Sequence, residues 1–272
     1  MYRELRRLLR AGLLMGHLVF GSLLALGVVL LPFAAVRRRV PAITAGWLSR
    51  GVAILGVRVL ARGRPHPRPV LMLANHISWL DILVLATQSD SGYIAKAELA
   101  DWPLLGWLAQ VGGTEFIRRG SYADLARVRE QMAWRLKAGQ RLTVFPEGTS
   151  GSQVLPSRFR PRLIQAAVAA KVPVQPVAIY YGSHPERIAF VGEDSFLSNL
   201  WALLGADPVL AEVTFLPVLG TLSGDCRLLA DESWRGVIHA LTRLELFERE
   251  SRQAQGLPDS LQDTDLKPIR AV

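Results

Sequence analysis

The sequence predicts an α/β fold, with a single sheet flanked by helices and preceded by an N-terminal membrane-associated helical hairpin or helix. Short β-rich runs alternate with helical patterns from residue 57 onward, which is typical of a sheet covered by helices. A nearly uninterrupted apolar segment over residues 11–31 precedes them. The 272 residues, half of them hydrophobic, suffice for one medium domain with an appended element. We therefore expect membrane-associated helices over residues 1–56, a globular domain over residues 57–252 and a loosely ordered tail over residues 253–272.

The first apolar segment is long enough to cross about 30 Å of hydrocarbon as a helix. A cleaved signal peptide does not fit its length, Pro32, or the lack of a small-residue cleavage site followed by polar sequence. A second semi-apolar segment over residues 42–55 follows Pro41, so the two could form a hairpin that dips into one leaflet. Arginines on both sides of the first segment remove the asymmetry that orients a single span, and a hairpin would leave both basic ends at anionic headgroups. These arginines are Arg3, Arg6, Arg7, Arg10, Arg37, Arg38 and Arg39.

The domain that follows is expected to alternate strands and helices, with ligands bound where the loops gather at the strand tips. The expected strands are residues 57–61, 70–74, 93–95, 116–117, 142–145, 174–180 and 211–218. The expected helices are residues 82–87, 103–111, 122–137, 160–170 and 233–252.

The net charge of +9 implies an anionic partner, which either nucleic acid or the cytoplasmic face of a membrane provides. The apolar N-terminus favours the membrane, and no nucleic-acid-binding motif supports the other partner, so we expect no nucleic acid. The single cysteine, Cys226, excludes an intramolecular disulfide and a thiolate cluster. Because metal-ligand spacing and nucleotide-binding glycine loops are absent from the sequence, we expect no metal and no cofactor.

A histidine and an aspartate, His76 and Asp81, follow directly on the apolar run that ends at Ala74. Histidine titrates near neutral pH and can take a proton from an alcohol, while a carboxylate behind it holds the ring and stabilises the imidazolium. The spacing brings the two together if Asp81 lies in the first turn of a helix that opens near Ser78 or Trp79. A polar strand-to-helix turn, with Asn75 and Ser78 as local caps, explains the same residues without chemistry.

A second motif, Phe-Pro-Glu-Gly-Thr, follows the β-rich run over residues 141–144. Pro146 lacks an N–H donor and Gly148 permits positive φ, so the chain must turn and present Glu147 and Thr149 at a strand tip. An ordinary turn would need the proline and the glycine but would not need the glutamate.

Together, Asn-His-x4-Asp and Phe-Pro-Glu-Gly-Thr resemble the 1-acylglycerol-3-phosphate acyltransferase family of glycerolipid and lysophospholipid acyltransferases. Two further blocks of that pattern fall in order, Gly-Thr-Glu-Phe-Ile-Arg-Arg over residues 113–119 and Val-Pro-Val-Gln-Pro-Val over residues 172–177. The resemblance covers residues 57–220 and implies an acyltransferase domain. It implies transfer of a fatty acyl group from acyl-CoA or acyl-carrier protein, as co-substrate, to the free hydroxyl of a lysolipid. It also implies docking on the cytoplasmic face of the inner membrane through N-terminal helices.

Under this interpretation His76 is the general base and Asp81 its partner, with no acyl-enzyme, because the lysolipid hydroxyl attacks the activated thioester directly. The resemblance makes Arg119 the ligand of the acceptor's anionic headgroup, a role that suits a bidentate guanidinium. The acceptor pocket is completed by Glu147, Gly148 and Thr149. A further hypothesis places Lys96 as the cation that stabilises the tetrahedral oxyanion.

The acceptor expected first, by family breadth, is 1-acyl-glycerol-3-phosphate, which gives phosphatidic acid. The family often has an arginine after Pro-Glu-Gly-Thr, whereas this chain has Ser150, followed later by Arg158, Arg160 and Arg162. That departure resembles the subgroup that acylates lyso-ornithine lipid or related lysolipids. A lipid hydrolase and a non-enzymatic membrane-binding module are the alternatives from other classes.

Overall fold

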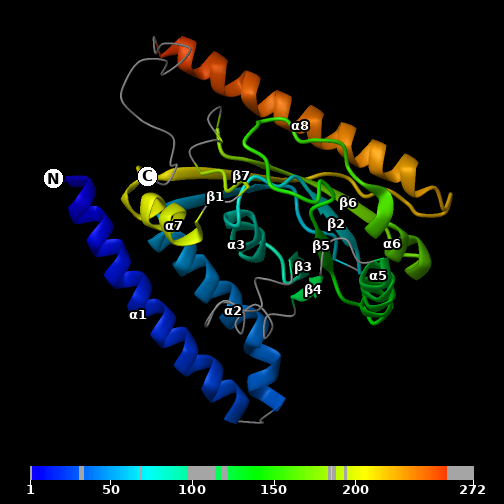
Figure 1. Cartoon of the computed structure of the whole chain (residues 1–272), viewed down its shortest axis with the longest axis horizontal. Helices are drawn as coiled ribbons and strands as arrows, with labels where there is room; N and C mark the ends of the chain where they lie inside the picture. Colours follow the sequence, from blue (N-terminus) through cyan, green and yellow to red (C-terminus); the bar gives the residue numbers. More distant parts are fainter. Residues whose placement is uncertain are drawn as a thin grey trace.

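A twisted sheet forms the centre of the computed structural model, which describes residues 2–30, 34–67, 69–96, 114–117, 122–182, 185, 188–192 and 195–255 (Figure 1). Within these residues the sheet has seven strands in the order β1-β7-β6-β2-β5-β3-β4. Their bounds are β1 Val57–Arg62, β2 Leu71–Ala74, β3 Gly92–Lys96, β4 Glu115–Ile117, β5 Leu142–Val144, β6 Val174–Tyr180 and β7 Val209–Phe215.

Strand direction brings the predicted motifs to one edge of this sheet. Strands β6, β2, β5, β3 and β4 pair in parallel, so their carboxyl ends lie together. Strand β7 runs antiparallel to β6, and β1 runs parallel to β7. His76 follows β2 and Glu147 follows β5, its direct neighbour in the sheet, so two motifs far apart in sequence meet at adjacent strand tips.

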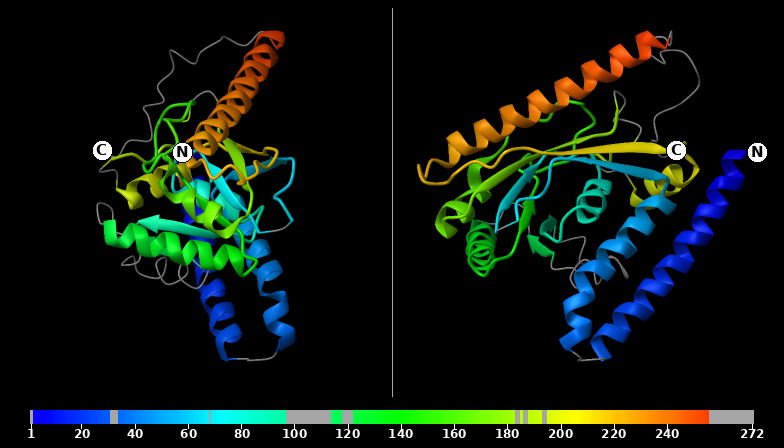
Figure 2. Two further views of the ribbon diagram at one scale, coloured as in Figure 1. Left: turned by 90° about the vertical axis from the view of Figure 1, so that its right-hand side faces the viewer. Right: turned by 180° about the vertical axis from the view of Figure 1, so that it is seen from behind.

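Helices cover both faces of the sheet, and each face has its own hydrophobic core (Figures 1 and 2). Strand β2 is buried throughout and alternates between them, with Leu71 and Leu73 in one core and Met72 and Ala74 in the other. The first core lies under α5 (Tyr122–Lys137), α6 (Gln165–Ala170) and α8 (Cys226–Ala254). The second lies under α3 (Leu80–Ala86), α7 (Phe196–Gly205) and the end of α2 (Ala34–Ile54).

Helices α1 (Tyr2–Leu30) and α2 form an antiparallel hairpin that extends beyond the sheet (Figure 2). Close packing joins them where the Trp47 ring covers Gly21, so closely that a Cβ on residue 21 would lie 2.5 Å from the ring. Trp47 also donates its ring N–H to the His17 carbonyl and stacks on the His17 ring. Residues 2–27 of α1 are long and apolar enough to cross a membrane. The predicted helical hairpin is therefore present, although α2 begins at Ala34 rather than after Pro41.

Three of the N-terminal arginines act within the protein, which corrects their assignment to lipid headgroups alone. Arg6 donates to the Gly205 carbonyl at 2.7 Å, Arg7 to that of Trp201 at 3.0 Å, and Arg10 to that of Ala206 at 2.8 Å. The last carbonyls of a helix lack intrahelical partners and carry partial negative charge, so cations stabilise them. The basic end of α1 is thereby fixed to the carboxyl end of α7.

Three helices differ most from the expectation. Helix α6 begins at Gln165 rather than residue 160, after a 3-10 turn over Pro161–Leu163. Helix α7 was not predicted, although its apolar residues, interrupted by Ser198 and Asn199, do recur with a helical period. Helix α8 begins at Cys226 rather than residue 233. The Asp225 side chain caps this start, because it accepts hydrogen bonds from the Arg227 and Leu228 amides. The helix predicted over residues 103–111 and most of the predicted tail lie outside the described residues.

Candidate active site

The loop that carries His76 is anchored by Asn75, a buried residue directly after β2. The Asn75 side chain donates to the Ile179 carbonyl at 2.9 Å and accepts from the Ile179 amide at 2.8 Å. The amide side chain thus replaces a backbone partner for β6 where β2 leaves the sheet. A residue expected only as a local cap is in fact a bridge between two central strands, and it fixes where the histidine begins to turn.

His76 and Asp81 form the pair that the spacing predicts. The Nδ1 atom of His76 lies 2.8 Å from Oδ2 of Asp81, which is in the first turn of α3. The aspartate side chain is fully buried, whereas the histidine side chain is 19% exposed. Because Asp81 holds Nδ1, the proton on the ring is placed there and the lone pair of Nε2 is left for a substrate.

Further donors hold the Asp81 carboxylate in place. The backbone amides of Ile77 and Ser78 donate to Oδ2 at 2.6 and 2.9 Å, so the turn itself wraps around the carboxylate. The hydroxyl of Tyr181, just past the end of β6, donates to Oδ1 at 2.7 Å. Both aspartate oxygens are therefore engaged, and the carboxylate cannot rotate away from the imidazole without breaking several buried hydrogen bonds.

Tyr181 is the site residue that the sequence analysis missed. Burial, together with the adjacent Asp81 carboxylate, raises the pKa of Tyr181 well above its ordinary value. The phenol therefore stays protonated and remains a donor at any physiological pH. The available signal was positional, because a polar residue at the end of a strand parallel to β2 must lie at the same sheet edge.

Glu147 holds the histidine loop from the neighbouring strand tip. Its Oε1 accepts from the His76 amide at 2.7 Å, and its Oε2 accepts from the amide and the hydroxyl of Ser157 at 2.8 and 3.1 Å. The residue is 5% exposed, and burial raises the pKa of its carboxyl group despite these hydrogen bonds. The ring of Phe145 stacks on that of His76, with centroids 4.1 Å apart. The Phe-Pro-Glu motif thus positions the histidine as well as forming a turn.

The rest of the second motif opens toward solvent. Gly148 has a φ of 79°, as the predicted turn requires, and Thr149 is exposed. Arg160 lies over this turn, and a Cβ on Gly148 would come within 3.1 Å of its guanidinium. Ser150 donates its hydroxyl to the Phe190 carbonyl. A cationic group is therefore present near the strand tip, although it comes from residue 160 and not from residue 150.

Two residues predicted to bind substrate lie at or beyond the limit of the described residues. Lys96 is the last residue of β3, at the same edge of the sheet, and its side chain lies outside what the structure describes. Arg119 lies outside the described residues, but β4 ends two residues earlier at that edge. Their roles remain predictions. Where the structure describes the chain, no three His, Cys, Asp or Glu side chains gather as metal ligands would.

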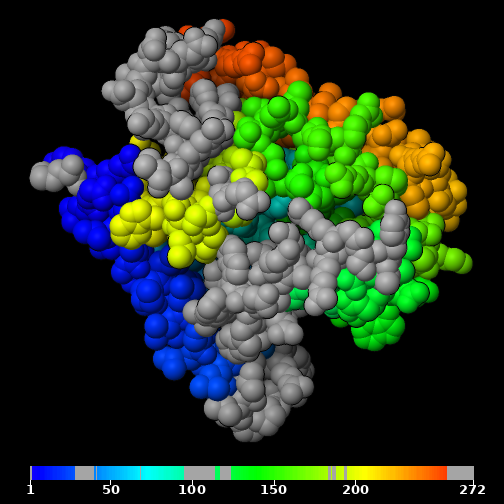
Figure 3. All heavy atoms as spheres, in the orientation of Figure 1, coloured from blue at the N-terminus to red at the C-terminus, as the bar shows by residue number. Residues whose placement is uncertain are grey.

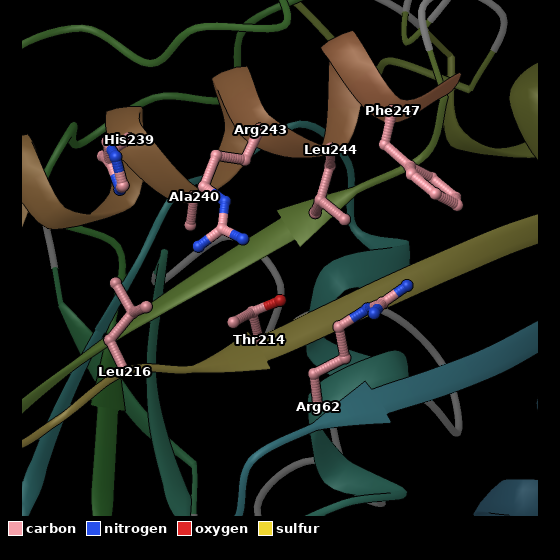
Figure 4. A pocket seen from close by; sticks show the side chains of 8 residues that line it. All are labelled: Arg62, Thr214, Leu216, His239, Ala240, Arg243, Leu244 and Phe247. Carbon is pink, nitrogen blue, oxygen red and sulfur yellow. The ribbon is translucent and has the colours of Figure 1, made fainter. Parts of the chain in front are cut away.

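A separate groove of about 300 Å³ lies on the α8 face of the sheet (Figure 4). Leucine, phenylalanine and alanine side chains line it together with Arg62, His239 and Arg243. Asp81 belongs to α3 on the opposite face, so this groove is not part of the histidine site.

Comparisons with known proteins identify the family of this chain. The acyltransferase family model matches residues 58–180, which include both motifs. A lyso-ornithine lipid O-acyltransferase of Pseudomonas aeruginosa is 36% identical over 90% of this chain and 95% of its own length. The chain belongs to the acyltransferase family. A 1-acyl-sn-glycerol-3-phosphate acyltransferase of Neisseria gonorrhoeae is 34% identical over 70% of this chain and 81% of its own length.

The fold has a solved counterpart. The 1-acyl-sn-glycerophosphate acyltransferase PlsC from Thermotoga maritima superposes with a TM-score of 0.70 at 21% identity, and the match covers 89% of this chain and 97% of that one. The predicted α/β class, with a single sheet flanked by helices and an apolar N-terminal helix, is confirmed.

Proposed function

We propose that the protein transfers a fatty acyl group from an acyl thioester, acyl-CoA or acyl-carrier protein, to the free hydroxyl of a lysolipid. The observation that carries the proposal is the pairing of His76 Nδ1 with buried Asp81, which leaves Nε2 free at an open strand tip. Membership of the acyltransferase family supports the same reaction class.

His76 performs the proton transfers of this reaction. Its Nε2 takes the proton of the lysolipid hydroxyl as the oxygen attacks the thioester carbonyl, and Asp81 stabilises the imidazolium that forms. The tetrahedral intermediate then collapses, the carbon–sulfur bond breaks, and the thiolate takes the proton back from His76. No acyl-enzyme forms, because the acceptor oxygen is itself the nucleophile.

Tyr181 and Glu147 are positioning residues in this mechanism. Tyr181 restrains Asp81 through Oδ1, and Glu147 restrains the His76 backbone through its amide. Because both oxygens of Glu147 already accept protein hydrogen bonds, we assign it to the loop and not to a lipid amine or hydroxyl. Arg119, Lys96, Gly148 and Thr149 remain the proposed contacts to substrate.

The acceptor we favour is lyso-ornithine lipid, with lysophosphatidate as the second candidate. The relative with that acceptor in its name aligns over nearly its whole length, and Ser150 replaces the arginine expected near a phosphate. The placement of the Arg160 guanidinium over Gly148 favours lysophosphatidate, since a guanidinium binds a phosphate as well as a carboxylate. Neutralising Arg160 would then weaken use of lysophosphatidate selectively.

A screen of the purified protein with one acyl donor against a panel of lysolipids tests the reaction and the acceptor together. We expect acylated lysolipid only when both substrates are present, and a loss of about 10²–10⁴ in rate for a folded His76→Ala protein. Free fatty acid formed equally with and without acceptor would identify a hydrolase. Lipid binding without turnover would identify a membrane-binding module. A kcat/KM at least tenfold higher for lysophosphatidate than for lyso-ornithine lipid would overturn the favoured acceptor.

A further inference from the structure

Helix α7 lies at the surface but has no polar outer face. Its ten residues include no charged side chain, and its exposed positions, Leu197 and Trp201, are 72% and 46% exposed. These residues are four apart and share one side of the helix. A surface helix in water normally turns charged or polar residues outward, and one that is apolar all round is normally buried. The outer face of α7 is therefore suited to an apolar environment. We propose that α7 is a second membrane-contacting element, and that Leu197 and Trp201 enter the lipid headgroup region beside α1.

The apolar outer face of α7 adjoins that of α1, and this indicates a bilayer as its partner. Helix α1 exposes a long apolar face, and only 6% of its most apolar window is buried in the protein. Atoms of α7 and α1 adjoin on one face of the molecule (Figure 3). The Arg7 guanidinium lies over the Trp201 ring, 5.3 Å from its centroid, while it donates to the Trp201 carbonyl. Tryptophan, with its apolar ring and polar N–H, is a residue that anchors proteins at the boundary between hydrocarbon and water, and Arg7 holds Trp201 in place there.

Three arginines make α1 and α7 one structural unit. Arg6 and Arg10 donate to carbonyls at the end of α7 and Arg7 donates to the Trp201 carbonyl one turn earlier, so a membrane that holds α1 also holds α7 at a defined depth. An isolated Leu or Trp on a surface carries no such meaning, since single exposed apolar residues are common. Here the two residues extend an apolar surface that already belongs to a helix long enough for a bilayer.

Helix α7 also touches the histidine loop. Asn199, on its buried side, accepts a hydrogen bond from the Trp79 indole at 2.9 Å and donates to the Ala189 carbonyl at 3.1 Å. Trp79 lies between His76 and Asp81 in sequence and packs edge-on against Phe196. One face of α7 thus meets the catalytic loop while the other meets lipid. This arrangement would hold His76 at a fixed height above the leaflet from which a lysolipid enters.

Site-specific labelling locates the helix directly. Cys226, the only cysteine, is replaced by serine, and Leu197→Cys is labelled with a fluorophore that shifts to the blue in apolar surroundings. Labels at Leu13→Cys on α1 and Trp134→Cys on α5 serve as positive and negative controls, because both side chains are exposed and only α1 is expected in lipid. The protein is reconstituted in phosphatidylcholine–phosphatidylglycerol vesicles with or without lipids brominated on their acyl chains.

We expect the label at residue 197 to shift to the blue and to be quenched by brominated lipid, as at residue 13 and unlike residue 134. A residue-197 label that behaves like the one at residue 134 would overturn the proposal. A blue shift without vesicles, and without bromine quenching, would assign the face to self-association and would also overturn it. The readout needs no turnover, so it stands apart from the proposed reaction.

Charge substitution gives a second measurement. Leu197→Glu with Trp201→Glu should lower the vesicle partition coefficient of the full chain by roughly tenfold, because two apolar side chains lose their lipid contact. Trp134→Glu removes a more exposed tryptophan of α5, 69% exposed against 46% for Trp201, and should leave partitioning unchanged. Equal partitioning of both variants would contradict the proposal.

Discussion

Replacing Tyr181 with phenylalanine should lower kcat/KM by a measurable factor of less than about tenfold while leaving the protein folded. The substitution removes one buried hydrogen bond, the 2.7 Å contact to Oδ1 of Asp81, and leaves the three contacts to Oδ2 in place. Without this donor Oδ1 of Asp81 is a buried acceptor that has lost its partner, and the carboxylate is held less firmly behind His76. The imidazole is then positioned less precisely for the substrate hydroxyl, so proton transfer to it slows.

The magnitude follows from the charge on the acceptor. A hydrogen bond to a charged group contributes about 1.5–3 kcal/mol. This loss falls mainly on the stability of the fold, because the three contacts to Oδ2 still orient the carboxylate toward His76. The rate should therefore fall by less than about tenfold, whereas Asp81→Asn should approach the loss of about 10²–10⁴ for His76→Ala.

The adjacent tyrosine supplies the matched control. The Tyr180 hydroxyl donates to Glu248 at 2.6 Å, a bond of similar length to a carboxylate, but Tyr180 belongs to the core under α8. Tyr180→Phe should therefore weaken the fold without lowering kcat/KM. Initial rates at one pH, with folding checked by circular dichroism, provide the comparison. A folded Tyr181→Phe protein whose kcat/KM matches that of Tyr180→Phe would refute the reasoning.

Three other predictions concern the strand tips. Arg119→Ala should raise the KM for the lysolipid more than that for the acyl donor, and a change in the donor KM alone would remove Arg119 from the acceptor site. Gly148→Ala should cost about 1 kcal/mol of stability at its φ of 79° and displace Arg160, so a melting temperature and acceptor KM equal to those of the parent would contradict the described turn. Because burial raises the pKa of Glu147, the folded protein binds that proton more tightly than the unfolded chain. The contribution of Glu147 to the free energy of unfolding is therefore greatest below its unfolded pKa and is lost as pH rises through its folded pKa. When the free energy of unfolding is measured from pH 4 to 7, Glu147→Gln should lack this dependence.

Local sequence determined the chemistry of this protein to a large extent. Proline and glycine force the turn at residues 146–148 wherever the strand ends, and the five-residue spacing from His76 to Asp81 closes through the turn at residues 77–79 that precedes α3. Such short-range features need no partner from elsewhere in the chain. Strand β6 and helix α5 were likewise predicted with the bounds that the structure shows, since periodicity and β-branched composition act within each segment.

Only the tertiary structure decided which groups support the site. Tyr181 reaches Asp81, and Glu147 reaches the His76 amide, because β6, β2 and β5 are adjacent and parallel. That order depends on the packing of all strands and helices together, and no single segment encodes it. The arginines near the start of α1 show the same limit. In sequence they resemble a membrane flank, but the folded chain uses three of them to bind carbonyls in and just after the last half of α7. A cation binds the anionic partner that the fold places nearest, and the sequence alone does not give that distance.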